Sequence, residues 1–303
     1  MTSTMQLTLT PLDWIVTTLL LIGSIALGAY LAFRIRAGDS SDNFFLAGRR
    51  MIWPIIGASF FATNIGAEHL VGLCGDAYRY GLGAGTIELT GILSMGFAAA
   101  FIFPYYVKHR VFTIPQFIEM RYTPAARFVY SGFMLVITIM SKMALGLFAG
   151  ALVLQGLLGW DVMTTVVAIG ALAAVITIVG GFAMVAYTDS IQTLIIIAGC
   201  TVMTCVGLNA VGGWTALNET VPQAMHIAKP FDDPNYPFWG VLLAGFYAGV
   251  YYWGIDQTNV QRALGAKDVN HARWGTMFAV ALKLAPVFIF ALPGVIALAH
   301  ASR

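Results

Sequence analysis

Several ionisable side chains occur inside long apolar runs of this sequence, where each needs a chemical reason. The first group lies in residues 62–69 and includes Glu68 and His69. Gly66 and Gly72 bracket this polar stretch, so a continuous helix is weakened there. An ionisable group in an apolar, lipid-like environment is costly and indicates a functional site.

A helix that breaks in this stretch frees backbone carbonyl groups, which suit a hard cation such as sodium. It also directs side chains such as Asn64 and His69 toward a central cavity. The alternative is a helix pair sealed by small residues and interhelical hydrogen bonds. Because Glu68 and His69 together exceed what packing needs, the sequence favours a broken helix.

Two further charges lie deep in apolar runs. Glu88 is a lone carboxylate, which either serves packing or accepts two hydroxyl hydrogen bonds, as polyol recognition uses. The sequence alone leaves both open. Lys283 lies about ten residues into the last run, too deep for its ammonium group to reach water easily. We expect it to pair with Glu88 or Asp256, or with a ligand hydroxyl.

A second interrupted run covers residues 238–261. Tyr252 and Trp253 offer an aromatic platform, and Asp256 and Gln257 follow within the same run. The alternative is an aromatic belt at the membrane surface. The polar residues before the basic end, with Gly254 as a hinge, favour another broken helix, and we expect Asp256 and Gln257 to take part in coupling or gating.

The remaining ionisable and sulfur-containing residues give weaker signals. Asp189 stands at the start of the run 190–211, where an N-cap is the favoured interpretation and a cation exit the alternative. Lys142 is interpreted as structural with an unknown partner. The three cysteines have no paired spacing and are expected to be small core residues.

The composition of the chain indicates the environment in which these residues lie. The 303 residues are 59% hydrophobic and 10% charged, with a net charge of +2 and a mean hydropathy of +0.80. An average soluble domain is about 25% charged. This composition excludes a disordered chain, a nucleic-acid-binding protein and an ordinary soluble enzyme, and it indicates a polytopic protein of the lipid bilayer.

Eight apolar runs are long enough to be membrane helices. They cover residues 12–33, 52–73, 82–107, 126–158, 162–180, 190–211, 238–261 and 274–299. No alternating strand pattern occurs, so a membrane β-barrel is excluded. The sequence therefore predicts an all-α polytopic membrane protein with one transmembrane domain over residues 1–303.

The basic residues predict the orientation, because positive loops remain cytoplasmic. Alternate loops place 11 of the 16 basic residues on one side and three on the other. The richer side, which includes Arg34, Arg36 and Arg262, is predicted to be cytoplasmic. Residue Arg303 belongs to the poorer side, so both ends of this chain are predicted to be extracytoplasmic, in the plasma or inner membrane of the cell.

The two interrupted runs lie in corresponding positions of two units that face opposite ways. Five runs occupy residues 52–211, and an odd number of crossings inverts the unit that follows. Residues 238–300 then begin the second unit, and residues 11–34 form an extra helix before the first. Paired interrupted helices of this kind mark the binding site of inverted-repeat transporters.

Three stretches resemble the sodium/solute symporter family, and most of all its sodium/glucose cotransporter branch. They are residues 64–72, residues 180–192, with Gly180-Gly181-Phe182 and Thr188-Asp189-Ser190-Ile191-Gln192, and residues 252–262. The resemblance implies a LeuT-type inverted-repeat fold preceded by one helix. It also implies that further helices follow the eighth run, so the chain is expected to be an N-terminal portion, a split protein that needs a partner, or a partial record.

The resemblance also assigns roles to residues of this chain. It implies sodium contacts from the backbone carbonyls of Ala62 and Ile65, and it links Asp189 to cation coupling. Sugar contacts are implied at six positions, namely Asn64, His69, Glu88, Tyr252, Trp253 and Lys283.

The leading hypothesis is therefore a secondary transporter that couples sodium entry to uptake of a sugar or related polyol by alternating access, with no cofactor besides the coupling ion. The alternatives are a sodium symporter for a non-sugar solute and a symporter-like sensor module of a signalling protein. A membrane enzyme is disfavoured, because no nucleophile–base pair, metal-ligand spacing or phosphate loop is evident.

Overall fold

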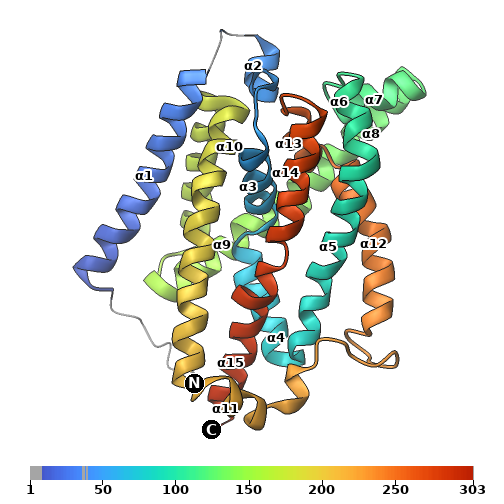
Figure 1. The fold of residues 1–303 in the computed structure, drawn as a ribbon. Coiled ribbons are helices and arrows are strands. Elements are labelled where there is room, and N and C mark those ends of the chain that lie inside the picture. The colour runs from blue at the N-terminus through green and yellow to red at the C-terminus, as the bar shows by residue number, and fades with distance from the viewer. Residues whose placement is uncertain (1–8, 36–37, 39, 303) are drawn as a thin grey trace.

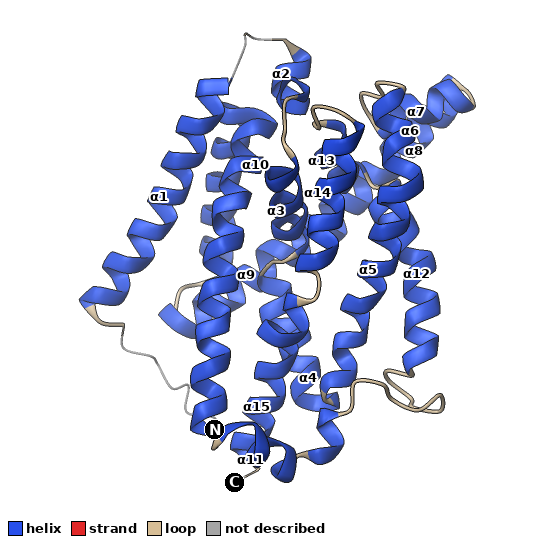
Figure 2. Cartoon of the chain, in the orientation of Figure 1, coloured by secondary structure: helices blue, strands red, loops and turns tan. Residues whose placement is uncertain are grey.

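The computed structural model describes residues 9–35, 38 and 40–302, as a bundle of helices that run mostly side by side (Figure 1). Within these residues no strand occurs, and Figure 2 shows helices joined by loops. The all-α prediction is confirmed. Arg36 and Arg303, which entered the charge count, lie outside the described residues.

The elements follow the apolar runs closely. In chain order they are α1 Pro11–Ile35, α2 Ser41–Leu46, η1 Ala47–Arg49, α3 Trp53–Asn64, η2 His69–Leu73, α4 Cys74–Tyr80, η3 Leu82–Gly85, α5 Thr86–Phe97, η4 Ala98–Ile102, α6 Phe103–Lys108, α7 Ile114–Arg121, α8 Pro124–Ile137, η5 Thr138–Met143, α9 Ala144–Leu158, α10 Val162–Ala210, α11 Gly213–Thr220, η6 Pro222–Met225, α12 Phe238–Gly254, α13 Gln257–Leu264, α14 Val269–Leu282, η7 Val287–Ala291 and α15 Leu292–Ala301.

Five continuous stretches of the described residues are long and apolar enough to cross a membrane, and the bent pair α12–α13 makes a sixth. One of the five is α10, with 49 residues. At a rise of 1.5 Å per residue it measures about 74 Å, more than twice a bilayer core of about 30 Å. Its two halves therefore make two crossings, and the interrupted passage α3–η2–α4 adds another.

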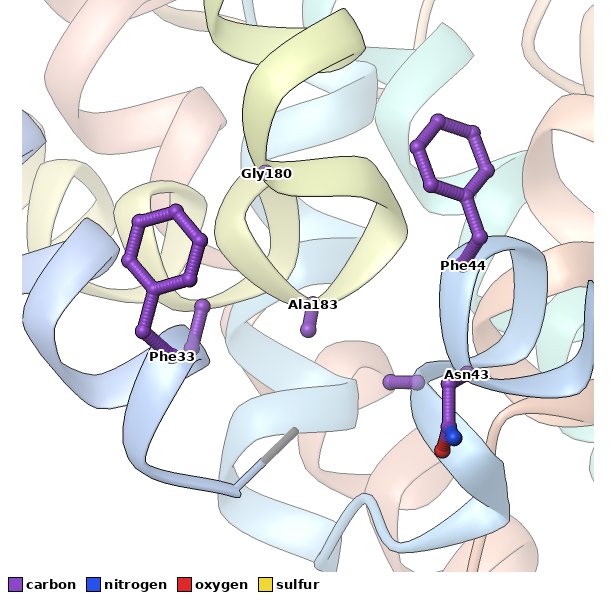
Figure 3. A pocket seen from close by; sticks show the side chains of 7 residues that line it. Phe33, Asn43, Phe44, Gly180 and Ala183 are labelled. Atoms are coloured by element: carbon purple, nitrogen blue, oxygen red, sulfur yellow. The ribbon is translucent and has the colours of Figure 1, made fainter. Parts of the chain in front are cut away.

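The turn inside α10 occurs at Gly181, whose φ of 60° and ψ of −163° are not helical. A Cβ atom there would lie 2.7 Å from the Phe44 carbonyl oxygen, so only glycine fits. Figure 3 shows Gly180 and Ala183 at this turn, between Phe33 of α1 and Phe44 of α2. The turn therefore depends on α2 packing closely against the α10 backbone.

The structure corrects the interpretation of Asp189 as an N-cap. The second half of α10 begins at Gly181, so Asp189 lies two turns inside a helix that is already formed. Asp161 is the N-cap of α10, since its carboxylate accepts from the Thr164 N–H at 2.9 Å. The predicted start of the sixth crossing at Asp189 was wrong, because the crossing begins at the glycine pair Gly180 and Gly181.

Two other expectations are also corrected. Arg262 was counted among the loop residues, but it is only 8% exposed and lies within α13. Cys205 is exposed rather than a core residue, whereas Cys74 and Cys200 are half-buried, and all three are free thiols. Cys205 lies on α10, in a stretch that is long and apolar enough to cross a membrane.

Packing between crossings brings distant parts of the chain together around α3. Helix α3 lies between α10 and α14, α5 packs along α12, and α1 packs along α10. The largest apolar cluster contains Phe60 of α3 and Trp253 of α12, whose rings meet edge to face at 6.2 Å. The second half of α3 and the end of α12 are thereby held next to each other in the middle of the bundle.

Candidate functional site

A cavity of about 530 Å³ lies in the middle of the bundle, between the end of α3, α5, α12 and the end of α14. Its lining contains the six side chains at which the family resemblance implies sugar contacts, Asn64, His69, Glu88, Tyr252, Trp253 and Lys283. These residues span 220 positions of the sequence. The structure therefore brings the whole expected solute-binding set to one cavity.

The break in the second crossing supplies the first two of these side chains. Helix α3 ends at Asn64, and Ile65 has an extended backbone with φ of −101° and ψ of 114°. The Ile65 N–H still bonds the Phe61 carbonyl, so the carbonyl groups after Phe61, Ala62 among them, lie at an open helix end. The helix resumes before His69, which directs that side chain into the cavity.

Only one of the two expected glycines lies at this break. Gly66 follows Ile65 in the non-helical linker, as predicted. Gly72 instead lies inside the π-helical turn η2, which continues directly into α4. The prediction that Gly72 bounds the break is therefore wrong, because a wider helical turn accommodates it without interruption.

The charged groups of the cavity form one connected cluster. The Lys283 ammonium bonds the Glu88 carboxylate at 2.6 Å and also bonds the Asn64 side-chain oxygen. The His69 Nε2 atom lies 3.3 Å from the other Glu88 oxygen. Glu88 and Lys283 are each 4% exposed, and their opposite charges compensate each other, as buried ions require.

This cluster settles the choice of partner that the sequence left open. Lys283 pairs with Glu88, not with Asp256. The approach is possible because α5 has a glycine at position 91, where a Cβ atom would meet the Lys283 Cε at 3.3 Å. A lysine stem can therefore cross the face of α5 to reach a carboxylate one turn away.

An aromatic platform borders the charged cluster. The Tyr252 hydroxyl accepts a hydrogen bond from the Asn64 side-chain amide at 3.3 Å, and the Lys283 ammonium lies 5.6 Å from the centre of the Trp253 ring. The Tyr252 and Trp253 rings meet edge to face at 4.9 Å. Ring faces beside charged hydrogen-bonding groups suit a ligand with an apolar face and a rim of hydroxyl groups.

The second break lies between α12 and α13, which meet at an angle of 57°. The Gly254 and Ile255 carbonyl groups, which the break frees, accept hydrogen bonds from the Tyr106 and Tyr130 hydroxyl groups at 3.0 and 2.8 Å. The predicted interruption is confirmed. Satisfying its carbonyl groups with hydroxyl groups of the protein is what allows a bent backbone at this depth.

Asp256 and Gln257 stabilise the same break. One Asp256 oxygen accepts from the Thr258 N–H at 2.9 Å and so caps α13, while the other pairs with Lys142. The Gln257 side-chain oxygen accepts from the Ile114 N–H at 2.7 Å. Lys142, whose partner the sequence did not identify, is therefore bound to Asp256. The expected part of Asp256 and Gln257 in coupling or gating stays a prediction.

Asp189 lies outside the central cavity and contacts a different set of groups. Its carboxylate accepts from the Ser59 hydroxyl at 2.8 Å and lies 3.6 Å from the Arg262 guanidinium. It thus connects α10 with α3 and α13. The expected role of Asp189 in cation coupling and the expected sodium contacts of Ala62 and Ile65 stay predictions. Among the described residues, no group of three His, Cys, Asp or Glu side chains is arranged to hold a metal ion.

The sequence interpretation missed several residues of the cavity wall. Gly245 and Gly249 face α5 from α12, and a Cβ atom at Gly245 would lie 2.5 Å from the Thr90 side chain. Small residues four positions apart are a known sign of close helix contact in membranes. That spacing was present in the sequence and could have predicted the α5–α12 contact.

Comparisons with known proteins show which family the chain resembles. The model of the family described as "Sodium:solute symporter family" matches residues 44–302. The chain is 31% identical over 283 residues to the human protein named sodium/myo-inositol cotransporter, covering 84% of this chain and 39% of that protein. It is 33% identical over 310 residues to the pig (Sus scrofa) protein named sodium/myo-inositol cotransporter 2, covering 96% and 46%.

A solved structure gives the same architecture. It is a Na⁺-coupled sialic acid symporter in a substrate-bound outward-open state, with a TM-score of 0.81 and 20% identity, covering 95% of this chain and 60% of that one. This likeness supports the expected transporter fold. The chain spans less than half the length of the two curated relatives.

Proposed function

The chain belongs to the sodium:solute symporter family, and from this membership we propose that it binds a neutral polyhydroxylated solute, a sugar or related polyol, for sodium-coupled uptake. It is a multi-pass membrane protein, and its named relatives are cotransporters and not enzymes. The observation that carries the proposal is the central cavity, in which six expected contact residues converge.

The charges of the cavity favour a neutral solute. The Lys283 ammonium is compensated by Glu88 within the cavity, which leaves no excess positive charge for a carboxylate. Both groups retain hydrogen-bonding capacity, since an ammonium has three donors and a carboxylate has about four acceptor positions. A ring with several hydroxyl groups can share these donors and acceptors while its apolar face contacts Tyr252 or Trp253.

Sodium coupling is supported by the interrupted α3 crossing. Open carbonyl groups at the end of α3, with Ala62 and Ile65 as the expected contacts, supply the oxygen ligands that a hard cation prefers. Because Asn64 and His69 flank the same break and line the cavity, a cation bound there would alter the geometry of the solute site. Coupling then appears as a difference in affinity between two conformations.

Uptake into proteoliposomes tests the proposal. Purified full-length protein is reconstituted, and accumulation of labelled myo-inositol and glucose is measured with and without an inward sodium gradient. A tenfold gradient is worth about 1.4 kcal/mol per ion, so one coupled sodium concentrates a neutral solute up to about tenfold.

Sialic acid serves as the anionic comparison, and potassium replaces sodium in the matched vesicles. Sodium-dependent accumulation of either polyol, but not of sialic acid, is expected. Equal accumulation with and without the gradient would disprove sodium coupling. Accumulation of sialic acid alone would disprove the neutral solute class.

A further inference from the structure

Lys142 and Asp256 form an ion pair far from either end of their crossings. Lys142 lies in the π-helical turn η5, midway along the α8–α9 crossing, and Asp256 lies in the α12–α13 break. Asp256 is 2% exposed. Neither residue lines the central cavity, so the pair does not contact solute there. Two charges held at such depth still need a role, because each is costly in a membrane.

The Asp256 carboxylate joins two separate elements. Its Oδ1 atom caps α13 through the Thr258 N–H at 2.9 Å, and its Oδ2 atom pairs with Lys142. A helix N-terminus favours a carboxylate, so Asp256 remains on α13 whether or not Lys142 is present. Lys142 therefore adds a charged link between α13 and the α8–α9 crossing, beside the hydrogen bond of the Tyr130 hydroxyl to the Ile255 carbonyl.

Lys142 also contacts the aromatic platform of the solute cavity. Its Nζ atom lies 5.1 Å from the centre of the Tyr252 ring, within the range of a cation–π contact. The hydroxyl of the same ring accepts from the Asn64 amide at the cavity. Tyr252 is therefore held at its face by Lys142 and at its hydroxyl end by Asn64.

A second cavity lies on the other side of the break. It has a volume of about 370 Å³, and α8 and η5 line it together with Gln257 and Thr258. The central cavity is lined by Tyr252 and its neighbours, which precede the break. The three residues between these two sets, 254–256, include the carboxylate that Lys142 binds.

We propose that the Lys142–Asp256 ion pair is a latch. It holds α13 against the α8–α9 crossing, so that the central cavity stays closed toward the α13 side, and it places Tyr252 at the solute cavity. Lys142 acts as a positioning residue. The latch parts before solute moves from the central cavity toward the α13 side, and this last step rests on the proposed function.

Access to the central cavity from the α13 side measures the state of the latch. A reporter cysteine replaces Ala248, which lines that cavity, in a variant whose three native cysteines are removed. A charged methanethiosulfonate reagent is applied to the α13 side in membrane vesicles of known sidedness. Lys142→Met and Asp256→Asn are each expected to raise the modification rate at least tenfold, and the double variant is expected to be no faster than the faster single variant.

Lys142→Arg is the matched control, because it keeps the charge and is expected to keep the slow rate. Asp256→Asn preserves the helix cap, so it carries the test even where Lys142→Met fails to fold. Unchanged rates, or effects that add in the double variant, would overturn the latch.

Sodium-driven uptake measured on the same variants separates the two proposals. Faster modification in a protein without sodium-driven uptake would support the latch and contradict the proposed function. The latch alone would be contradicted if the parent protein showed sodium-driven uptake while the modification rate of the reporter cysteine stayed the same in all variants.

Discussion

At the scale of single residues, two lysines inside the crossings each pair with one carboxylate. Lys283 meets Glu88 and Lys142 meets Asp256. Tyr252 connects the two pairs, because its ring faces Lys142 and its hydroxyl bonds Asn64, which Lys283 also bonds. Removing one partner of a buried pair is strongly destabilising, by about 3–5 kcal/mol, because the other charge stays uncompensated. Each pair therefore has a structural task as well as any part in transport.

Lys283→Met is predicted to weaken polyol binding. A hydrogen bond to a charged group contributes about 1.5–3 kcal/mol, which corresponds to a loss of affinity of about 10-fold to 100-fold. Quenching of the intrinsic tryptophan fluorescence during titration with myo-inositol or glucose measures this affinity. Lys267→Met is the control, because Lys267 is exposed and distant from the cavity, and unchanged affinity in Lys283→Met would remove Lys283 from the site.

At the scale of elements, breaks and turns position the functional groups. The interrupted crossings α3–η2–α4 and α12–α13 each place polar side chains beside a break, and the glycine turn in α10 brings Asp189 beside Ser59 of α3. Such irregular backbone is tolerated in a membrane only where protein groups satisfy it. The Tyr106 and Tyr130 hydroxyl groups meet that requirement at the second break.

Gly181→Ala is predicted to destabilise the protein. An alanine would need a backbone region that L residues avoid, at a cost of about 1–3 kcal/mol, and its Cβ would lie 2.7 Å from the Phe44 carbonyl oxygen. The thermal unfolding midpoint in detergent is expected to fall.

Gly199→Ala, in the same helix, is the control for this substitution. No atom lies within 4 Å of its Cβ position, and alanine is a better helix former than glycine. An equal or higher midpoint is expected there. If Gly181→Ala had the same thermal unfolding midpoint as Gly199→Ala, the assigned turn would be contradicted.

At the scale of the whole molecule, the short helix α11 and the end of α15 lie at one end of the bundle (Figure 1). Helices α2 and α7 and the α13–α14 connection lie at the other. Basic residues such as Arg49, Arg121 and Lys267 belong to that second end. The positive-inside rule therefore predicts that the second end faces the cytoplasm.

Cysteine labelling is predicted to reveal this orientation. Asn218 on α11 and Lys267 before α14 are both exposed. In sealed right-side-out vesicles, Asn218→Cys is expected to react with an impermeant maleimide, and Lys267→Cys only after permeabilisation. The reverse pattern would invert the predicted orientation, so that the α13 side would face away from the cytoplasm.

Several features were predictable because they depend on local chemistry. Glycine and polar residues inside apolar runs predicted the breaks near Asn64 and Gly254, which the structure contains. The start of the sixth crossing was not predicted, because an acid at position 189 gives the same local signal as a helix cap. Gly181 took that role through its contact with Phe44, 137 residues away.

The sequence by itself determined that this protein needs a lipid solvent, since a chain with 10% charged residues cannot cover its apolar surface with polar groups. It also predicted two of the places where helices break, near Asn64 and near Gly254. Only the tertiary structure decided which charge meets which. Lys283 had Asp256 and Glu88 as equal candidates, and Lys142 had none. Partners 114 and 195 residues apart are selected by how helices pack, and Coulomb energy in a medium of low dielectric depends on distances of a few ångströms.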